Sequence, residues 1–95
     1  HNGDHAIYPD CRESFVRPFS EAVRNADWHS VEILRPFVNY SKTQVVKIGE
    51  SLGVEFAKTW SCYNGREFHC GKCGTCVERK EAFSESNVKD TTIYF

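Results

Sequence analysis

The sequence predicts a small α+β domain in which helices dominate, with one or two short strands and a zinc loop built on four cysteines. Three observations support this prediction. The chain has 95 residues, which is enough for one modest core. Apolar residues recur at helical spacing in two stretches. Four of the five cysteines fall within residues 62–76. We therefore expect a single zinc-bearing domain over residues 1–95.

The composition resembles that of an ordinary globular protein and excludes several classes. Hydrophobic residues make up 40% of the chain and charged residues 26%, with a net charge of −1. This balance gives no support to direct nucleic-acid binding, and no apolar run is long enough to cross a membrane. An odd cysteine count without a signal-peptide pattern indicates a reducing compartment, so we expect a cytoplasmic location.

The first two thirds of the chain are expected to begin with a loop, residues 1–10, followed by a helix–strand–helix region, residues 11–61. Apolar residues three and four positions apart predict the first helix over 11–26, with Asp10 as its N-cap. Because a proline inside a helix removes a hydrogen bond, Pro18 predicts a kink or a division into two shorter helices.

The middle of the chain carries one strand signal and one clear helix signal. VEILRPF at 31–37 is short and rich in β-branched and apolar residues, which predicts a strand that Pro36 ends or places at an edge. The stretch 41–52 has a capping-box pattern at its start and one apolar face, so it predicts a helix, with Gly53 as the C-cap. Residues 54–60 are expected to be extended.

The zinc loop is expected over residues 62–76, and a helix with a tail over 77–95. The helix signal itself begins near residue 76, and TTIYF at 91–95 predicts a terminal strand or an extended tail. A single strand cannot satisfy its own edges, which implies a partner sheet or a larger protein. We therefore expect a homodimer, with or without exchanged elements.

The cysteines in CYNGREFHCGKCGTC follow the spacing C-x7-C-x2-C-x2-C. Thiolates suit Zn²⁺, and two cysteines separated by two residues reach one ion from a tight turn. Gly71 and Gly74 each follow a cysteine and permit such turns. Because four protein ligands leave no position for water, the spacing predicts a structural zinc. The expected ligands are Cys62, Cys70, Cys73 and Cys76.

Other uses of these thiols stay open. The C-x2-C-x2-C run also occurs at iron–sulfur sites, although the Cys-Pro typical of those runs is missing here. A reducing compartment disfavours disulfides, and four crowded thiolates favour coordination over nucleophilic catalysis. His69 is either a fifth candidate ligand or a loop residue beside the metal. Cys11 is expected to be a small buried residue at a helix start.

Several stretches together resemble one enzyme family. They are GDHAIYPDCR (3–12), KTQVVKIGESLGVEFAKTWSCY (42–63), TWSCYNG (59–65), CGKCGTCVERKEAF (70–83) and VKDTTIY (88–94), the last with Thr91 where the family often has proline. They resemble the C-terminal half of the 7-cyano-7-deazaguanine synthases of queuosine biosynthesis. These enzymes belong to the PP-loop ATP pyrophosphatase superfamily, so the resemblance implies the C-terminal part of a PP-loop α/β fold.

The resemblance also implies an activity that these residues alone do not complete. The family uses ATP to convert 7-carboxy-7-deazaguanine and ammonia into the nitrile, and its four cysteines hold a structural zinc. Its phosphate-binding SGGxDS loop has no counterpart in this sequence. We therefore expect no catalytic residue in this chain, no activity of the chain alone, and ATP binding only if an N-terminal PP-loop half is supplied as partner. The alternative is a zinc-stabilised binding or interaction module, derived from the family, without ATP chemistry.

Their place in GDHAIYPDCR makes Asp4, Tyr8 and Asp10 the expected contacts to a deazaguanine substrate, whose edge needs donors and acceptors. The competing interpretations are structural: Asp10 as an N-cap and Tyr8 as a packing residue. Near the cysteines, Arg79 and Lys80 could meet phosphates, but we expect them on a solvated helix face.

Overall fold

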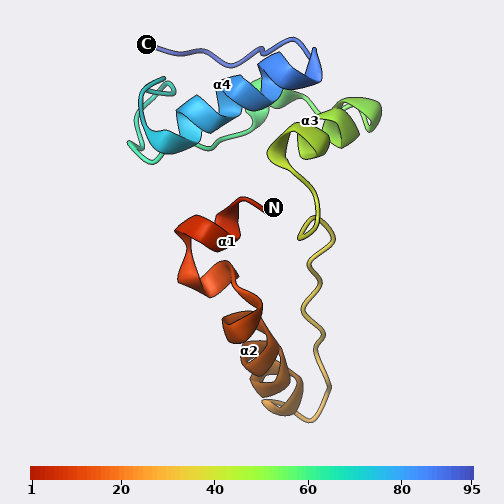
Figure 1. Ribbon diagram of the computed structural model, residues 1–95. Coiled ribbons are helices and arrows are strands. Elements are labelled where there is room, and N and C mark those ends of the chain that lie inside the picture. Colours follow the sequence, from red (N-terminus) through yellow and green to blue (C-terminus); the bar gives the residue numbers. More distant parts are fainter. The chain divides into compact units, whose positions relative to one another are not determined.

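The computed structural model describes residues 1–95 and contains helices but no strand (Figure 1). The helical elements are α1 (Asp4–Ile7), the 3₁₀ turn η1 (Pro9–Cys11), α2 (Glu13–Asn25), α3 (Lys42–Ser51), the 3₁₀ turn η2 (Phe56–Lys58) and α4 (Gly74–Ser86). Contacts group the chain into two compact units, His1–Ser41 and Lys42–Phe95. That the chain is one domain stays a prediction.

The start of the first unit differs from the predicted loop and cap. Residues 4–7 form the short helix α1, so the loop expected over residues 1–10 is wrong in its centre. Asp10 lies in η1, and the residue that caps α2 is Arg12, whose carbonyl accepts the N–H groups of Phe15 and Val16 at 3.0 and 2.9 Å. Asp10 is therefore not the N-cap of α2, because Pro9 begins a 3₁₀ turn that includes Asp10.

Helix α2 is a single helix that passes through Pro18, so the predicted division into two helices is wrong. The proline removes one N–H donor but lies six residues into the helix, where the remaining turns hold the backbone together. Charged residues on its outer face form helical ion pairs, including Arg24 to Glu21 at 2.6 Å.

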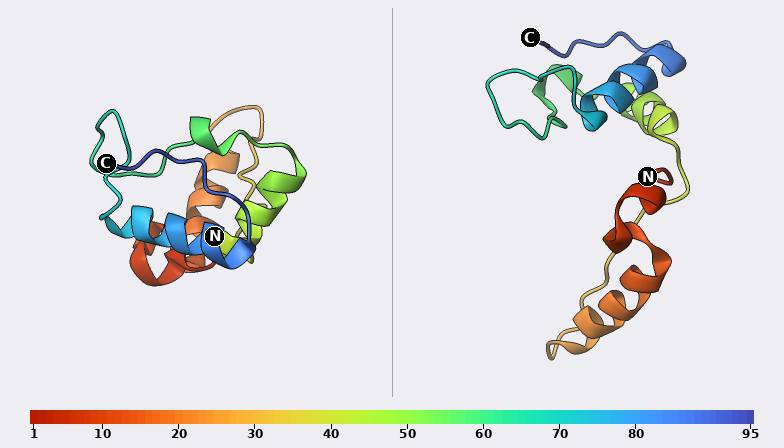
Figure 2. Two further views of the ribbon diagram at one scale, coloured as in Figure 1. Left: turned by 90° about the horizontal axis from the view of Figure 1, so that it is seen from above. Right: turned by 60° about the vertical axis from the view of Figure 1, so that its left-hand side comes forward.

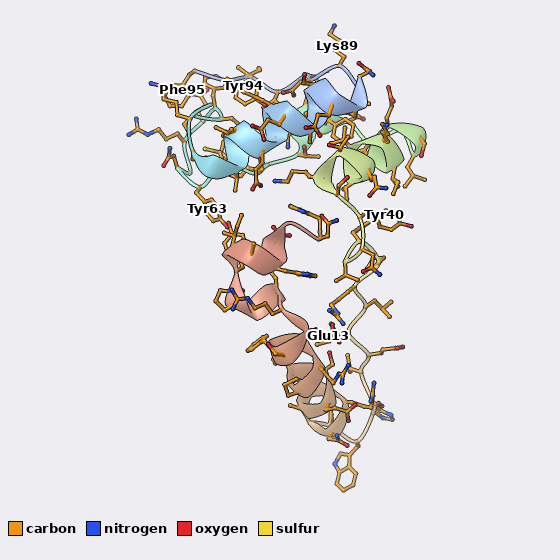
Figure 3. The ribbon with its side chains drawn as sticks, viewed as in Figure 1. Glu13, Tyr40, Tyr63, Lys89, Tyr94 and Phe95 are labelled. Atoms are coloured by element: carbon orange, nitrogen blue, oxygen red, sulfur yellow. The ribbon has the colours of Figure 1, made fainter.

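The strand predicted over residues 31–37 does not form. Residues 31–35 have no regular structure, and turns follow, in which the N–H of Val38 donates to the carbonyl of Arg35 at 3.3 Å. The segment runs back beside α2 (Figure 1), and Arg35 pairs there with Glu13 at 2.8 Å; Figure 3 shows the position of Glu13. A strand needs a neighbour to pair with, and none exists in this unit. The fold is thus helix-dominated and not α+β.

The helix predicted over residues 41–52 is confirmed as α3, and so is its glycine cap. The N–H of Gly53 donates to the backbone carbonyl of Glu50 at 3.0 Å, and the N–H of Val54 donates to that of Gly49 at 2.9 Å. Gly53 has a φ of +72°. These two bonds form a Schellman motif, which requires the left-handed conformation that glycine adopts without strain. The segment after it, expected to be extended, contains η2 instead.

The core of the second unit lies between α3 and α4. Val46, Ala82, Phe83 and Val88 are buried, and the ring of Phe56 meets that of Phe83 edge-on, with centroids 4.9 Å apart. Gly49 permits this packing, because a Cβ at that position would lie 2.7 Å from the Phe56 ring. Helix α4 ends at Asn87, which adopts the left-handed conformation.

The tail after α4 turns back and runs alongside that helix (Figures 1 and 2). It meets the cysteine loop at one isolated parallel bridge between His69 and Tyr94. The backbone N–H of His69 donates to the Ile93 carbonyl at 3.2 Å, and the backbone N–H of Phe95 donates to the His69 carbonyl at 3.0 Å. The terminal strand expected at 91–95 is therefore reduced to this bridge. None of the helices is long and apolar enough to span a bilayer.

Candidate metal centre

The loop between η2 and α4, with the first turn of α4, brings four cysteine sulfurs together. Their Sγ atoms all lie within 4.8 Å of one another. Three of the four side chains are buried, with Cys76 fully enclosed, and Cys73 is half-buried. The members of this cysteine cluster are Cys62, Cys70, Cys73 and Cys76, the set that the spacing predicts.

Backbone amides surround the sulfurs. The N–H groups of Lys72 and Cys73 both donate to Cys70 Sγ, at 3.4 and 3.3 Å, and those of Asn64 and Cys70 donate to Cys62 Sγ at 3.4 Å. This geometry depends on Gly71, whose φ of +69° turns the backbone back over the sulfur. Amides aimed at sulfur stabilise thiolates, the form that binds a metal.

The pKa values of the clustered thiols shift in opposite directions, downward for the half-buried Cys73 and upward for the enclosed Cys76. Thr75 Oγ1 lies 3.2 Å from Cys73 Sγ, and this hydrogen bond, supported by two backbone amides, lowers the pKa of Cys73 to about 5. The backbone amide of Lys72 leads the contributions that lower the pKa of Cys70. Burial raises the pKa of Cys76 to about 12, so a bound cation has to displace that proton.

The sulfur spacing fits one ion. A tetrahedral zinc with Zn–S bonds of about 2.3 Å holds its sulfurs about 3.8 Å apart. Cys62 Sγ and Cys73 Sγ lie 4.0 Å apart, and no pair exceeds 4.8 Å. A cubane cluster needs its four thiolates farther apart, because iron and sulfide atoms have to fit between them. The cysteine cluster could therefore hold a single metal ion, as the spacing predicts.

His69 is a buried packing residue that lies outside the cysteine cluster. Its Nε2 accepts a hydrogen bond from the backbone N–H of Ser61 at 3.2 Å, and its ring lies against that of Trp60, tilted by 39°, at a centroid distance of 4.2 Å. Burial, followed by the charge of Arg79, lowers its pKa. A neutral imidazole can accept this amide N–H. The hydrogen bond joins Ser61, the residue before Cys62, to His69, the residue before Cys70, so His69 positions the cysteine loop.

Arg79 is a structural residue that the sequence did not single out as buried. Its guanidinium donates to Thr92 Oγ1 at 2.8 Å, Thr59 Oγ1 at 2.7 Å and the Phe56 carbonyl at 3.0 Å. Only 9% of the residue is exposed, so the expected solvated helix face is wrong for Arg79. Its neighbour Lys80 is exposed, as expected, and donates to the Gly71 carbonyl at 3.0 Å.

The structure brings two of the three expected substrate residues to one hollow in the first unit. Asp4 and Asp10 line a hollow of about 280 Å³ with Cys11, which is half-buried, and with apolar side chains such as Val16. The main-chain amino nitrogen of His1 donates a hydrogen bond to Asp4 Oδ2 at 2.8 Å. Tyr8 ends α1 and is half-buried, but it does not line this hollow.

The fold and this centre define a helix-dominated chain with a cysteine cluster that could hold one metal ion. The model of one family, described as "Queuosine biosynthesis protein QueC", matches residues 1–87. This chain belongs to that family. No solved structure matches the chain significantly.

Known relatives are similar along nearly the whole chain. It is 56% identical over 94 residues to a 7-cyano-7-deazaguanine synthase of Porphyromonas gingivalis, covering 99% of this chain and 43% of the relative. It is 51% identical over 96 residues to that of Rhizobium johnstonii and 49% identical over 94 residues to that of Psychromonas ingrahamii, covering 99% of this chain and 41% and 42% of the relatives. The chain thus spans less than half the length of the relatives it matches.

Proposed function

We propose that this chain is the zinc-bearing, C-terminal portion of a 7-cyano-7-deazaguanine synthase. The observation that carries the proposal is the joint occurrence of two features. The chain is 56% identical to such an enzyme over 99% of its own length, and its four cysteine sulfurs lie at single-ion spacing. The reaction is the ATP-dependent conversion of 7-carboxy-7-deazaguanine and ammonia into the nitrile.

In this proposal zinc is structural. Cys62, Cys70, Cys73 and Cys76 would complete a tetrahedral shell and leave no position for water or substrate. The ion supplies cross-linking and not chemistry. The loop residues around it hold the thiolates through backbone amides. The Thr75 hydroxyl oxygen, in the first turn of α4, lies 2.7 Å from the Ser61 carbonyl oxygen and 3.2 Å from Cys73 Sγ, so it connects the helix to the loop.

The substrate side of the proposal lies in the first unit. Asp4, Tyr8 and Asp10 contact the deazaguanine, with the carboxylates accepting N–H groups on its edge. Asp4 and Asp10 line one hollow whose walls combine apolar side chains with polar ones such as Arg35, and such a lining suits a flat heterocycle with a polar edge. None of the three activates ATP, so the chain alone is inactive and needs a PP-loop half to bind ATP.

Two measurements test this function. Metal analysis of the purified chain should find one zinc per chain, and an absorption band near 400 nm would instead indicate iron–sulfur. The chain should form no nitrile from 7-carboxy-7-deazaguanine, ammonia and ATP, but should do so when it is mixed with a PP-loop half. A mixture that stays inactive, with both parts folded, would contradict the proposal.

A second candidate is a zinc-stabilised interaction module without ATP chemistry. It is favoured by the second unit, which has its own apolar core and its own cysteine cluster. Indifference to nucleotide and to deazaguanine, alone and with a PP-loop half, would support it.

We also propose that the chain forms a homodimer and that it is located in the cytoplasm. The dimer was expected from an orphan strand at 31–37, and no strand forms there. A monomeric mass by light scattering at micromolar concentration would refute the dimer.

A further inference from the structure

The hollow in the first unit is lined by two residues whose nitrogen donors are left without acceptors. His1 Nε2 and Arg35 Nη1 are buried, and neither has a hydrogen-bond partner. Both residues line the hollow that Asp4 and Asp10 also line. Because a buried donor without an acceptor costs free energy, two such donors beside one hollow indicate a ligand that supplies acceptors.

The guanidinium of Arg35 is held on one side and unpaired on the other. Its Nη2 lies 2.8 Å from Glu13 Oε2, while Nη1 has no partner. Glu13 also pairs with Arg17 at 3.8 Å, so this one carboxylate does not cancel the charge of both arginines. A guanidinium fixed in this way keeps the direction of its remaining N–H groups, which suits a planar acceptor such as a carboxylate.

The imidazole of His1 offers a second donor. The backbone N–H of Gly3 donates to His1 Nδ1 at 3.1 Å. A neutral imidazole that accepts at Nδ1 carries its hydrogen at Nε2, the atom that has no partner. Asp4 and Asp10 offer the opposite chemistry, because ionised carboxylates only accept hydrogen bonds. The lining of the hollow therefore combines two donor residues with two acceptor residues.

We propose that Arg35 and His1 bind the acceptor side of 7-carboxy-7-deazaguanine, which consists of its 7-carboxylate and the adjacent ring carbonyl. Asp4 and Asp10 then accept the ring N–H and amino groups on its other side. The inference rests on the proposed function and adds the orientation of the substrate. Arg35 is a specificity-determining residue in this arrangement, because a base without the carboxylate leaves its Nη1 unpaired.

The observations favour the carboxylate of the substrate over a phosphate of ATP as the anion beside Arg35. The hollow of about 280 Å³ is near the lower limit for ligand pockets, about 300 Å³, so it suits one bicyclic base and not a nucleotide. The carboxylates of Asp4 and Asp10 would also repel the several charges of a triphosphate. A base with one carboxylate can instead direct its N–H groups toward them.

The test measures binding to the zinc-loaded chain, alone and with a PP-loop half, by isothermal titration calorimetry without ATP. The probes are 7-carboxy-7-deazaguanine and 7-deazaguanine, which lacks only the carboxylate. We expect the chain to bind the carboxylate form about tenfold more tightly or better in at least one setting. Arg35→Met should weaken binding of the carboxylate form by about tenfold or more and change binding of 7-deazaguanine less than about twofold.

Matched variants separate substrate orientation from general damage. Arg17→Met removes the other arginine that pairs with Glu13, but Arg17 does not line the hollow, so both affinities should stay within about twofold. Arg35→Lys keeps the charge without the planar fork, so its affinity for the carboxylate form should lie between those of the unmodified chain and Arg35→Met. Circular dichroism checks that each variant keeps its helices.

Four outcomes would overturn the proposed orientation. They are binding of neither base in either setting, no preference for the carboxylate form, equal weakening of both bases by Arg35→Met, and normal binding of the carboxylate form by that variant. Binding of ATP that Arg35→Met abolishes would assign the guanidinium to the nucleotide and overturn it too. If Arg35→Met does not fold, Arg35→Lys and the comparison of the two bases on the unmodified chain decide.

Nitrile formation from 7-carboxy-7-deazaguanine, ammonia and ATP, with a PP-loop half present, tests the proposed function separately. An active mixture that shows no preference for the carboxylate form removes only the orientation. Selective binding that depends on Arg35, in a folded mixture that forms no nitrile, removes only the function.

Discussion

The two units of this chain, residues 1–41 and 42–95, differ far more in burial than in length. In His1–Ser41 one side chain, Val16, is buried, although this unit has the most amphipathic helix. In Lys42–Phe95 two helices, a cysteine loop and a tail enclose an apolar core and a sulfur cluster. Helix-forming sequence is thus not sufficient for a core, because an apolar face is stabilised only when something packs on it.

The second unit closes around its own residues because several kinds of contact converge on one helix. Helix α4 supplies Cys76 to the cluster and Phe83 to the apolar core. Between them Arg79 links η2 and the tail. A 54-residue unit is at the size where a metal adds what the core lacks.

The largest expected effect comes from removing the metal. Chelation, or Cys76→Ser, should melt α4 and the cysteine loop, since structural zinc contributes on the order of 10 kcal/mol in small domains. Far-ultraviolet circular dichroism with and without chelator measures this loss. Cys11→Ser, outside the cluster, should leave both zinc content and helicity unchanged. A chelated chain with unaltered helicity would show that the second unit does not depend on the ion.

The next effect tests the apolar core. Phe83→Ala removes a buried ring that packs on Phe56, and it should lower the free energy of unfolding by about 3–5 kcal/mol. Urea denaturation of the zinc-loaded chain gives the value. Val77→Ala, exposed on the same helix, should cost about 0.5 kcal/mol or less. Equal losses in the two variants would show that α4 does not pack as described.

Arg79→Met should lower the free energy of unfolding by about 2 kcal/mol, since it leaves the acceptors on Phe56, Thr59 and Thr92 without their buried donor. Thermal unfolding at constant zinc concentration measures the change. The exposed Arg66→Met serves as the control. A loss no larger than that of the control would mean that the guanidinium is solvated after all.

The smallest effect concerns the tail. The Tyr94 hydroxyl donates to Asp90 Oδ2 at 2.6 Å. Tyr94→Phe should therefore lower the free energy of unfolding by about 1 kcal/mol at neutral pH. Burial, followed by this hydrogen bond, raises the pKa of Tyr94 from 10.0 to about 12. The unfolded chain then loses its proton first, so this contribution is complete below pH 10 and disappears between pH 10 and 12. Tyrosinate absorbance should show a late step that Tyr94→Phe removes and the exposed Tyr63→Phe keeps.

The sequence predicted the local features well and the distant ones poorly. The helix at 42–51 followed from apolar spacing and Gly53, and the cysteine cluster followed from spacing alone, because both depend on neighbours in the chain. The strand at 31–37 was wrong because strands depend on a partner elsewhere. Asp10 was placed wrongly at the helix start, since Pro9 opens a competing 3₁₀ turn.

Amino-acid order by itself determined the family, the four sulfurs and the helical stretches, because these features are written in residue identity and short spacing. Only the tertiary structure decided that Arg79 and His69 are buried and that Asp4 and Asp10 share a hollow. It also decided that the face of α2 stays uncovered. Burial is a property of what surrounds a side chain, and the surroundings of a residue are assembled from parts of the chain that its own neighbours do not specify.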